Sequence, residues 1–376
     1  MNLLHICSYY SGSKLYSNLI KELANSNIKQ DVFVPIKDKN QIGRNELAKD
    51  QYENISFHYA NILLKSDRLF FNKKINKQFQ WVENQILSKK NINFIHAHTV
   101  FSDGGTAYEL HKKYGIDYIV NVRNTDINYF YKYRMHLRPL MYEILLHAKQ
   151  IVFISHAYMK KVISILPKQI LEKTKIKFKV IPNGIDNYWH ENPSLPKSLD
   201  SEDIKLLFIG RMDKNKNVKA IISALNHLSK DGHRCTLDMI GTGPLEKKMK
   251  SYSKKLGLGK NVTFHGHINE RESILSIMDD SHVFVMPSYT ETFGLVYIEA
   301  MSRGIPIIYT SGEGVDGFFE VGEVGYPILP NDKEDMIRKI FKIKENYKVT
   351  SSNCIKNSKK FDWKEISMNY LKCYNL

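Results

Sequence analysis

The sequence predicts an α/β protein with two domains. Its 376 residues are enough for two domains that each bury a core of their own. Short apolar runs typical of buried strands alternate with helical stretches; in residues 3–34, for example, a strand, a small-residue turn, a helix and a second strand follow one another. A later strand, Val283–Met286, leads through a polar loop into an apolar helix that Gly294 opens.

The stretch from Pro287 to Met301 contains the strongest candidate site. Thr292 is expected to cap the helix, which would expose the first-turn amides of Phe293, Gly294 and Leu295. Such amides, with the helix dipole behind them, favour a phosphate or diphosphate. Glu299 would lie about seven residues into the helix, roughly 10 Å along its axis. Glu291 and Glu299 could then hold hydroxyls on either side of a diphosphate, a geometry that suits a nucleotide sugar.

Spacing alone does not establish this site. With 20 glutamates in 376 residues, about one Glu-x7-Glu pair is expected by chance, so a strand-to-helix turn with incidental glutamates is the alternative. The order of strand, Pro-Ser, polar loop, Glu-Thr-Phe-Gly and helix resembles the Glu-x7-Glu motif of the retaining glycosyltransferases of family 4. The resemblance implies the GT-B fold, in which two Rossmann-like, doubly wound parallel-sheet domains face each other across a cleft.

The implied division of the chain has three parts. Residues 1–186 together with a C-terminal helix at 361–376 would form the acceptor-binding domain, and residues 204–360 would bind the donor. Residues 187–203, which contain Pro193 and Pro196, are expected to be the linker. The turn Pro182-Asn183-Gly184-Ile185-Asp186 before it resembles the family's turn ahead of the hinge.

Two further loops of the second domain are expected to bind the donor. A strand at 205–209 runs into Gly210-Arg211 and reaches Lys216 at a helix start, which resembles the family's diphosphate clamp. Arg211 would bind the diphosphate bidentately and Lys216 as a compact charge. The Gly241-Thr242-Gly243 turn lacks the third glycine of a dinucleotide fingerprint, so an NAD site is disfavoured and the resemblance places Gly241 near the nucleotide. The resemblance also places the main chain of His267 and Ile268 at the base.

The first domain offers weaker candidates for the acceptor and donor sugar. Gly12 lies in the first strand-to-helix turn, where the family commonly has a glycine pair, and the resemblance places His98 at a strand end that faces the cleft. Arg123 stands near the place of a family histidine. It cannot act as a base, but it can neutralise a phosphate. Asp126 fits the acidic residue of the same acceptor pocket, with a helix N-cap as the alternative.

Metal and disulfide chemistry are not expected. His96 and His98 share one face of a strand, but no third ligand is identifiable, and a catalytic zinc usually takes three. The chain contains no Asp-x-Asp pair for a metal-bound diphosphate, and its four cysteines are scattered. No apolar run is long enough for a membrane span and no signal peptide precedes the first strand, so a cytoplasmic protein is expected.

The charge of the chain is uneven. Of the net +16, residues 1–185 carry +14, from 28 basic and 14 acidic residues. Basic, aromatic stretches at 67–90 and 129–147 read as long amphipathic helices. They could lie on the anionic inner face of the cell membrane, or they could be ordinary surface helices in a protein of basic composition.

The function implied by the resemblance is retaining, metal-independent transfer of a hexose-type sugar. The donor would be a nucleoside-diphosphate sugar, most commonly a UDP-sugar, and the acceptor a glycan or lipid-linked glycan of capsule, exopolysaccharide or lipopolysaccharide biosynthesis. A nucleotide-sugar-binding module without catalysis is the main alternative, favoured if Arg123 blocks the acceptor chemistry. A nucleic-acid-binding protein is disfavoured because the basic half contains no recognition motif. A phosphorylase would need a phosphate site or a pyridoxal lysine, and neither is identifiable.

Overall fold

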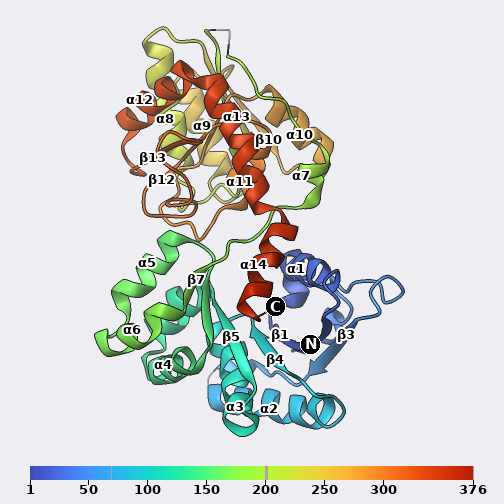
Figure 1. Cartoon of the computed structure of the whole chain (residues 1–376). Coiled ribbons are helices and arrows are strands. Elements are labelled where there is room, and N and C mark those ends of the chain that lie inside the picture. The colour runs from blue at the N-terminus through green and yellow to red at the C-terminus, as the bar shows by residue number, and fades with distance from the viewer. Residues whose placement is uncertain (69, 200–201, 376) are drawn as a thin grey trace. The chain divides into compact units, whose positions relative to one another are not determined.

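The computed structural model describes residues 1–68, 70–199 and 202–375 (Figure 1). The chain divides into two compact units. Unit 1 contains Met1–Ile154, Met159–Asn183 and the segment from Trp363 onward, and unit 2 contains Ser155–Tyr158 and Gly184–Asp362. The prediction of two parallel-sheet α/β domains is confirmed, since each unit has one parallel sheet with helices packed on it.

The unit boundaries differ from the predicted ones. Ser155–Tyr158 belongs to unit 2 because the Ser155 hydroxyl donates to the Thr292 carbonyl at 2.8 Å and the His156 ring lies 4.8 Å from that of Phe318. Residues 187–203, predicted to be a linker, begin with helix α7 (Asn187–Glu191) and group with unit 2; residues 200 and 201 lie outside the described chain.

Unit 1 is built on a seven-stranded sheet whose order is β3-β2-β1-β4-β5-β6-β7. All neighbouring strands are parallel. The strands are β1 (Asn2–Ile6), β2 (Lys29–Ile36), β3 (Ile55–Asn61), β4 (Phe94–Ala97), β5 (Asp117–Val122), β6 (Gln150–Phe153) and β7 (Phe178–Val180). The helices are α1 (Lys14–Ala24), α2 (Phe71–Val82), α3 (Gly105–Tyr114), α4 (Arg138–His147), α5 (His156–Ile165), α6 (Lys168–Thr174) and α14 (Trp363–Cys373); α5 belongs to unit 1 from Met159 onward.

Unit 2 repeats this plan with six parallel strands in the order β10-β9-β8-β11-β12-β13. The strands are β8 (Ile204–Ile209), β9 (Cys235–Ile240), β10 (Val262–Gly266), β11 (Val283–Val285), β12 (Ile307–Thr310) and β13 (Gly325–Ile328). Besides α7, the helices are α8 (Val218–Lys230), α9 (Glu246–Lys255), α10 (Arg271–Asp280), α11 (Leu295–Ser302), α12 (Lys333–Glu345) and α13 (Tyr347–Ser358).

Each sheet has one point where the strand order reverses. In unit 1 it lies between β1 and β4, and in unit 2 between β8 and β11. Ligands of open α/β sheets bind outside the carboxyl ends of the strands at such a point. The loops after these four strands are therefore the places where the fold itself predicts binding.

The last helix, α14, belongs to the core of unit 1 and lies beside α1 (Figure 1). Its buried face packs against the first strand and helix, in a cluster that includes Leu3, Leu19, Leu23, Trp363, Ile366 and Tyr370. Burying such side chains contributes about 1.5–3 kcal/mol each. The final residues of the chain thus stabilise the strand with which it begins.

The two basic, aromatic stretches are shorter helices than predicted. Within 67–90, helix α2 begins at Phe71 and continues as a π-helical segment at Glu83–Leu87; residue 69 lies outside the described chain. The single helix predicted over 129–147 is wrong. A π-helical turn ends at Tyr131 and α4 starts only at Arg138, because Pro139 favours the first turn of a new helix. Within the described residues, no helix combines the length and apolarity that crossing a membrane requires.

Candidate active site

The loops that follow β8 and β11 meet at the switch point of unit 2. The first carries Lys216 and the second carries Glu291, and these two side chains form an ion pair of 2.5 Å between Nζ and Oε2. Their side chains are only 20% and 15% exposed. Asn215 joins the two loops, because its side chain bonds both the amide and the carbonyl of Thr290. The two residues predicted on separate motifs are thus held together.

A third loop, between β12 and β13, supports Glu291 from the other side. The Glu291 amide donates to the Glu313 carboxylate at 2.9 Å, and the Gly314 amide donates to the Glu291 carbonyl at 2.9 Å. Gly314 has φ +57, and a Cβ there would meet the Phe293 carbonyl at 2.9 Å. The sequence analysis missed Glu313, although a glutamate between two glycines directly after a buried strand was a usable signal.

The start of helix α11 differs from the prediction. Thr292 is not the N-cap: Gly294 takes that position with φ +82, and the helix begins at Leu295. A Cβ on Gly294 would lie 2.6 Å from the Tyr297 ring, which anchors the turn through its hydroxyl bond to the Met286 carbonyl. The first amides of the helix are therefore those of Leu295 and Val296, for which the helix itself supplies no carbonyl one turn earlier, whereas the Tyr297 amide donates to the Gly294 carbonyl at 3.0 Å.

Thr292 and Phe293 have structural roles in this turn. The Thr292 carbonyl accepts the Ser155 hydroxyl, and the Phe293 ring is buried against Phe318 and Phe361. The later helix start also makes Glu299 only the fifth helical residue, so the predicted 10 Å of axial rise is wrong.

Glu299 lies in a partly buried cluster with α7 and α10. Burial, with the nearby Asp186 charge, raises the pKa of Glu299 to about 7, against the opposing effects of Arg271 and a hydrogen bond from Trp189. Asp186 is itself held by two bonds from Arg271, at 2.8 and 3.0 Å. A carboxyl group kept at such a pKa is typical of a functional position.

The remaining donor-side candidates lie at the same edge of the sheet. Arg211 is 74% exposed, and its one ion pair within the described part of the chain is with Asp213 at 3.9 Å, so its guanidinium is free to turn toward a ligand. His267 and Ile268 directly follow β10, with His267 exposed and Ile268 half-buried.

In the glycine turns after β8 and β9, the main chain of one turn lies directly against the main chain of the other. The Gly241 amide donates to the Gly266 carbonyl, and a Cβ on Gly241 would lie 2.1 Å from the Gly210 carbonyl oxygen. Gly210 and Gly241 therefore allow the loop ends of three neighbouring strands to approach closely.

In unit 1 a pocket of about 250 Å³ lies at the carboxyl ends of the strands. Its lining includes Ser8, Gly12, Lys74, Thr99 and Asp126. Gly12 has no atom within 4 Å of the place a Cβ would occupy, so this position does not require glycine for steric reasons. The pocket does bring Gly12 and Asp126, predicted on separate loops, to one place.

Asp126 is an organising residue of this pocket. It is buried, and its two oxygens accept the main-chain amides of Val100, Phe101 and Arg123 at 3.1, 3.3 and 2.8 Å. Burial nevertheless raises its pKa to about 7. The predicted alternative, an N-cap of the following helix, is wrong, because Thr125 is the N-cap and Asp126 is the first residue of that helix.

Arg123 is held in place by its surroundings. Its Nε donates to the His98 carbonyl at 3.4 Å, its Nη1 donates to Asn183 at 3.1 Å, and its guanidinium lies 5.7 Å from the centre of the Tyr16 ring. The residue thus ties the ends of β4 and β5 to the turn that contains Asn183.

The expectation that His96 and His98 have no third histidine nearby is wrong. His5 joins them in a buried group whose ring nitrogens lie within 4.8 Å of one another. His96 bonds Tyr374 and Asn121 through its two nitrogens, and its ring stacks on that of His98 with centroids 4.0 Å apart. His5 Nδ1 and His98 Nε2 lie 3.0 Å apart, which is hydrogen-bonding distance.

Comparison with known proteins indicates the family. Residues 193–361 match the family model "Glycosyl transferases group 1". This segment of the chain therefore matches a family of glycosyltransferases. The chain is 26% identical over 345 residues to an uncharacterized glycosyltransferase of Methanocaldococcus jannaschii, covering 87% of this chain and 86% of that protein. It is 30% identical over 154 residues to a Mycobacterium tuberculosis glycogen synthase, covering 41% of this chain and 36% of that protein.

Solved structures show that the chain has the GT-B fold. The apo lipopolysaccharide outer core galactosyltransferase WaaB superposes with a TM-score of 0.74 at 17% identity, covering 100% of this chain and 99% of that one. Sucrose-phosphate synthase from Thermosynechococcus elongatus superposes with a TM-score of 0.73 at 18% identity, covering 100% and 98%. At these identities the likeness shows the fold alone. The matched segment 193–361 contains Arg211, Lys216, Glu291 and Glu299.

Glu313 is expected to orient Glu291. Glu313→Ala removes the acceptor of the Glu291 amide and should lower kcat/KM by about tenfold or more. Glu313→Gln keeps a carbonyl acceptor and should stay within about threefold of the wild type. The control is Glu320→Ala, an exposed glutamate in the same loop. Equal losses in Glu313→Ala and Glu313→Gln would show that the charge matters rather than the bond.

Glu299 should make the protein less stable as the pH rises. Its folded pKa of about 7 lies above its ordinary value of 4.5, so the folded state holds the extra proton between these values. Stability therefore falls as the pH rises through this window. In urea unfolding at pH 5 and pH 8, Glu299→Gln should gain stability relative to the wild type at the higher pH. A difference that does not depend on pH would contradict the raised pKa.

Proposed function

We propose that the protein transfers a hexose-type sugar from a UDP-sugar to a glycan or lipid-linked glycan, with retention of configuration and without a metal ion. The observation that carries this proposal is the Lys216–Glu291 pair at the switch point of unit 2, next to the open first turn of α11. A structural neighbour, Anabaena HepE, was solved in complex with UDP-glucose, which supports the choice of donor.

In this mechanism the donor-side groups stabilise the departing diphosphate. Lys216, Arg211 and the amides of Leu295 and Val296 would balance the charge that develops as the bond from the sugar to the phosphate oxygen breaks. Glu291 would orient the sugar hydroxyls, and Glu299 would bind the ribose. The acceptor oxygen would form its bond on the face that the phosphate leaves, and a phosphate oxygen would take the acceptor proton.

The acceptor is proposed to belong to surface-polysaccharide or glycolipid synthesis. Relatives named for such roles include a putative colanic acid biosynthesis glycosyltransferase and a monoglucosyldiacylglycerol synthase. The pocket of unit 1 that Gly12 and Asp126 line is the proposed acceptor site, with Arg123 beside it able to face a phosphate.

A panel of nucleotide sugars and lipid-linked acceptors, with the products analysed by mass spectrometry, tests the proposal. Transfer from a UDP-hexose with a retained anomeric configuration, undiminished by EDTA, is the expected result. Donor binding without transfer or hydrolysis would favour the alternative, a nucleotide-sugar-binding module. Loss of transfer in EDTA would contradict metal independence.

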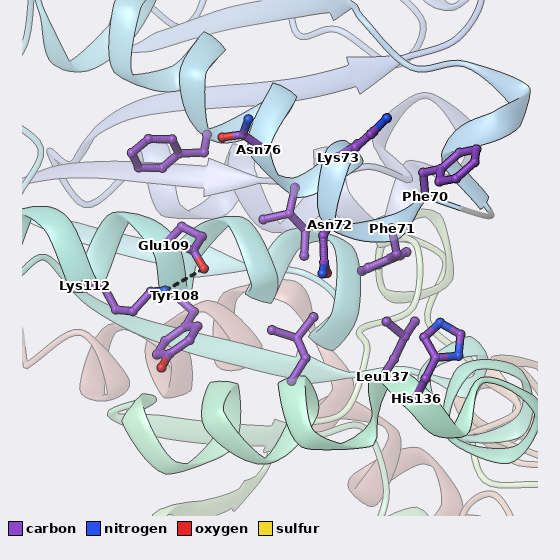
Figure 2. A pocket seen from close by; sticks show the side chains of 13 residues that line it. Phe70, Phe71, Asn72, Lys73, Asn76, Tyr108, Glu109, Lys112, His136 and Leu137 are labelled. Carbon is purple, nitrogen blue, oxygen red and sulfur yellow. Dashed lines mark ion pairs between the residues drawn. The ribbon is translucent and has the colours of Figure 1, made fainter.

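Unit 1 also supports peripheral contact with an anionic membrane, as an enzyme at the cytoplasmic face would make. A groove of about 830 Å³ lies between α2, α3 and residues 136–140 (Figure 2). Phe70 at its edge is 56% exposed, and the Lys73 ammonium lies 5.1 Å from the centre of that ring. Lys112 pairs with Glu109 at 2.8 Å on the opposite wall. Aromatic side chains beside lysines suit the headgroup region of anionic lipid.

Co-sedimentation with phosphatidylglycerol vesicles tests this contact. Lys73→Glu should weaken binding about five- to tenfold at low salt, because each lysine near such a surface contributes about 1 kcal/mol. Lys168→Glu, at a side chain 90% exposed on α6, is the matched control and should bind as the wild type does. Equal losses in both variants would indicate net charge alone rather than this groove.

A further inference from the structure

A chain of hydrogen bonds fixes the proton positions beneath the strand ends of unit 1. It begins at Gln30 on β2, whose Nε2 donates to the Ile20 carbonyl at 3.0 Å. A carbonyl can only accept, so the amide orientation of Gln30 is determined and its Oε1 is an acceptor. That oxygen lies 3.0 Å from His5 Nε2, which must therefore carry a proton.

The position of the proton on His98 follows in the same way. Burial lowers the pKa of His5 to about 4 and that of His98 well below its ordinary value, so both rings are neutral. A neutral His5 that is protonated on Nε2 has a bare Nδ1, and this atom lies 3.0 Å from His98 Nε2. His98 must then donate through Nε2, which leaves its Nδ1 without a proton.

His98 Nδ1 is buried and has no hydrogen-bond partner among the described residues. A buried polar atom without a partner is costly and calls for a physical explanation. His98 directly follows β4 at the switch point of unit 1, and the next residue, Thr99, lines the pocket of this unit. The place is one where a parallel sheet binds ligands, and the available atom is an acceptor.

We propose that Gln30 and His5 are positioning residues that hold His98 in the tautomer protonated on Nε2, so that Nδ1 accepts a hydroxyl group of the acceptor sugar. The ligand in this inference rests on the proposed glycosyl transfer, whereas the tautomer does not. This chain of hydrogen bonds from Gln30 through His5 makes His98 selective for a hydroxyl group at one position of the sugar. A site built around a hydrogen-bond acceptor rejects an analogue that lacks the donating hydroxyl group.

Nitrogen-15 NMR of histidine-labelled wild-type protein at pH 8 tests the His98 tautomer and needs no measurement of enzyme activity. His98 should show a protonated Nε2 and a bare Nδ1, and its signals are identified by their loss in His98→Gln. His111 is the internal reference, since its Nδ1 lies 3.0 Å from the Ile116 carbonyl and must carry a proton. A protonated Nδ1 on His98 would overturn the proposed chain of hydrogen bonds, even if the enzyme transferred sugar normally.

Two variants at Gln30 separate positioning from packing. Gln30→Met removes the fixed acceptor, so His98 should show both tautomers and kcat/KM should fall about tenfold. Gln30→Glu keeps an acceptor oxygen toward His5 in either charge state. This variant should therefore show the same His98 tautomer and the same kcat/KM as the wild type. A loss of activity in Gln30→Met with an unchanged His98 tautomer would show a merely structural role. Should Gln30→Met fail to fold, the wild-type spectrum and Gln30→Glu still decide the tautomer.

Singly deoxygenated analogues of the acceptor sugar, each tested with the same UDP-hexose, show which hydroxyl group His98 binds. In the wild type one analogue should lose about tenfold or more in kcat/KM, and in Gln30→Met this preference should shrink to about threefold or less. A preference that is equal in both proteins would overturn the ligand assignment. Failure of the proposed function is distinguishable, because no UDP-hexose would then be transferred while the spectrum still showed the expected tautomer.

Discussion

Lys216→Ala is expected to lower kcat/KM by about 10²–10³-fold, because it removes a preorganised positive charge from the place where the leaving diphosphate develops charge. The same substitution leaves Glu291 partly buried without its counter-ion, which should further disturb the carboxylate proposed to orient the sugar. Steady-state kinetics with the best UDP-hexose would measure the loss.

A matched control lies at the other end of strand β8. Lys205 also forms an ion pair, with Asp280 at 2.6 Å. It is the second residue of β8, so it lies at the opposite end of the strand from the edge where ligands are expected to bind. Lys205→Ala should keep wild-type kinetics. Glu291→Gln should be nearly as inactive as Lys216→Ala, and the double variant should lose little more, because groups that act as a unit are not additive. Full activity in Lys216→Ala would remove this pair from the site.

Gly241→Ala should destabilise the protein by about 3 kcal/mol or more, since the new Cβ would overlap main chain and force the β8 and β9 turns apart. The backbone at Gly241 has φ +121, and the nearest atom, the Gly210 carbonyl oxygen, lies 2.1 Å from the Cβ position. Urea unfolding, followed by circular dichroism, would measure the change in the free energy of unfolding.

Two other glycines of unit 2 separate the backbone effect from the clash. Gly257 has φ +77 with no atom near its Cβ position. Gly257→Ala should therefore lower the free energy of unfolding only by the cost of holding alanine in the left-handed conformation, about 1–2 kcal/mol. Gly259 has neither constraint, and Gly259→Ala should stay within about 0.5 kcal/mol of the wild type. If Gly241→Ala cost no more than Gly257→Ala, the close packing of the two turns would be refuted.

The loops proposed to bind the donor could be located from the sequence because each lies where a local pattern changes. An apolar strand followed by Gly-Arg, and another followed by Pro-Ser and a polar loop, mark strand ends without knowledge of the rest of the chain. The order of the strands then brings these ends together, since β8 and β11 are neighbours in the sheet. The contact between Lys216 and Glu291 spans 75 residues, and no local pattern could give it.

The errors arose where a distant segment overrides the local pattern. Thr292 has the composition of an N-cap, but the Tyr297 anchor and the Glu313 loop hold the chain so that the helix starts after Gly294. His5 looks like any buried strand residue until β1 pairs with β4, which sets it directly opposite His96. Only that pairing shows that the His96 and His98 pair has a third member.

The sequence by itself determined the class of the fold and the places where strands end in the loops proposed to bind the donor, because hydrophobic periodicity and turn residues act over a few positions. The tertiary structure alone decided which of those side chains meet. It paired Glu291 with Lys216, directed the Asp126 carboxylate at the main-chain amides of Val100 and Phe101, and left Nδ1 of His98 without a hydrogen-bond partner among the described residues. These outcomes depend on strand order and on contacts between segments far apart in the chain, which local periodicity does not encode.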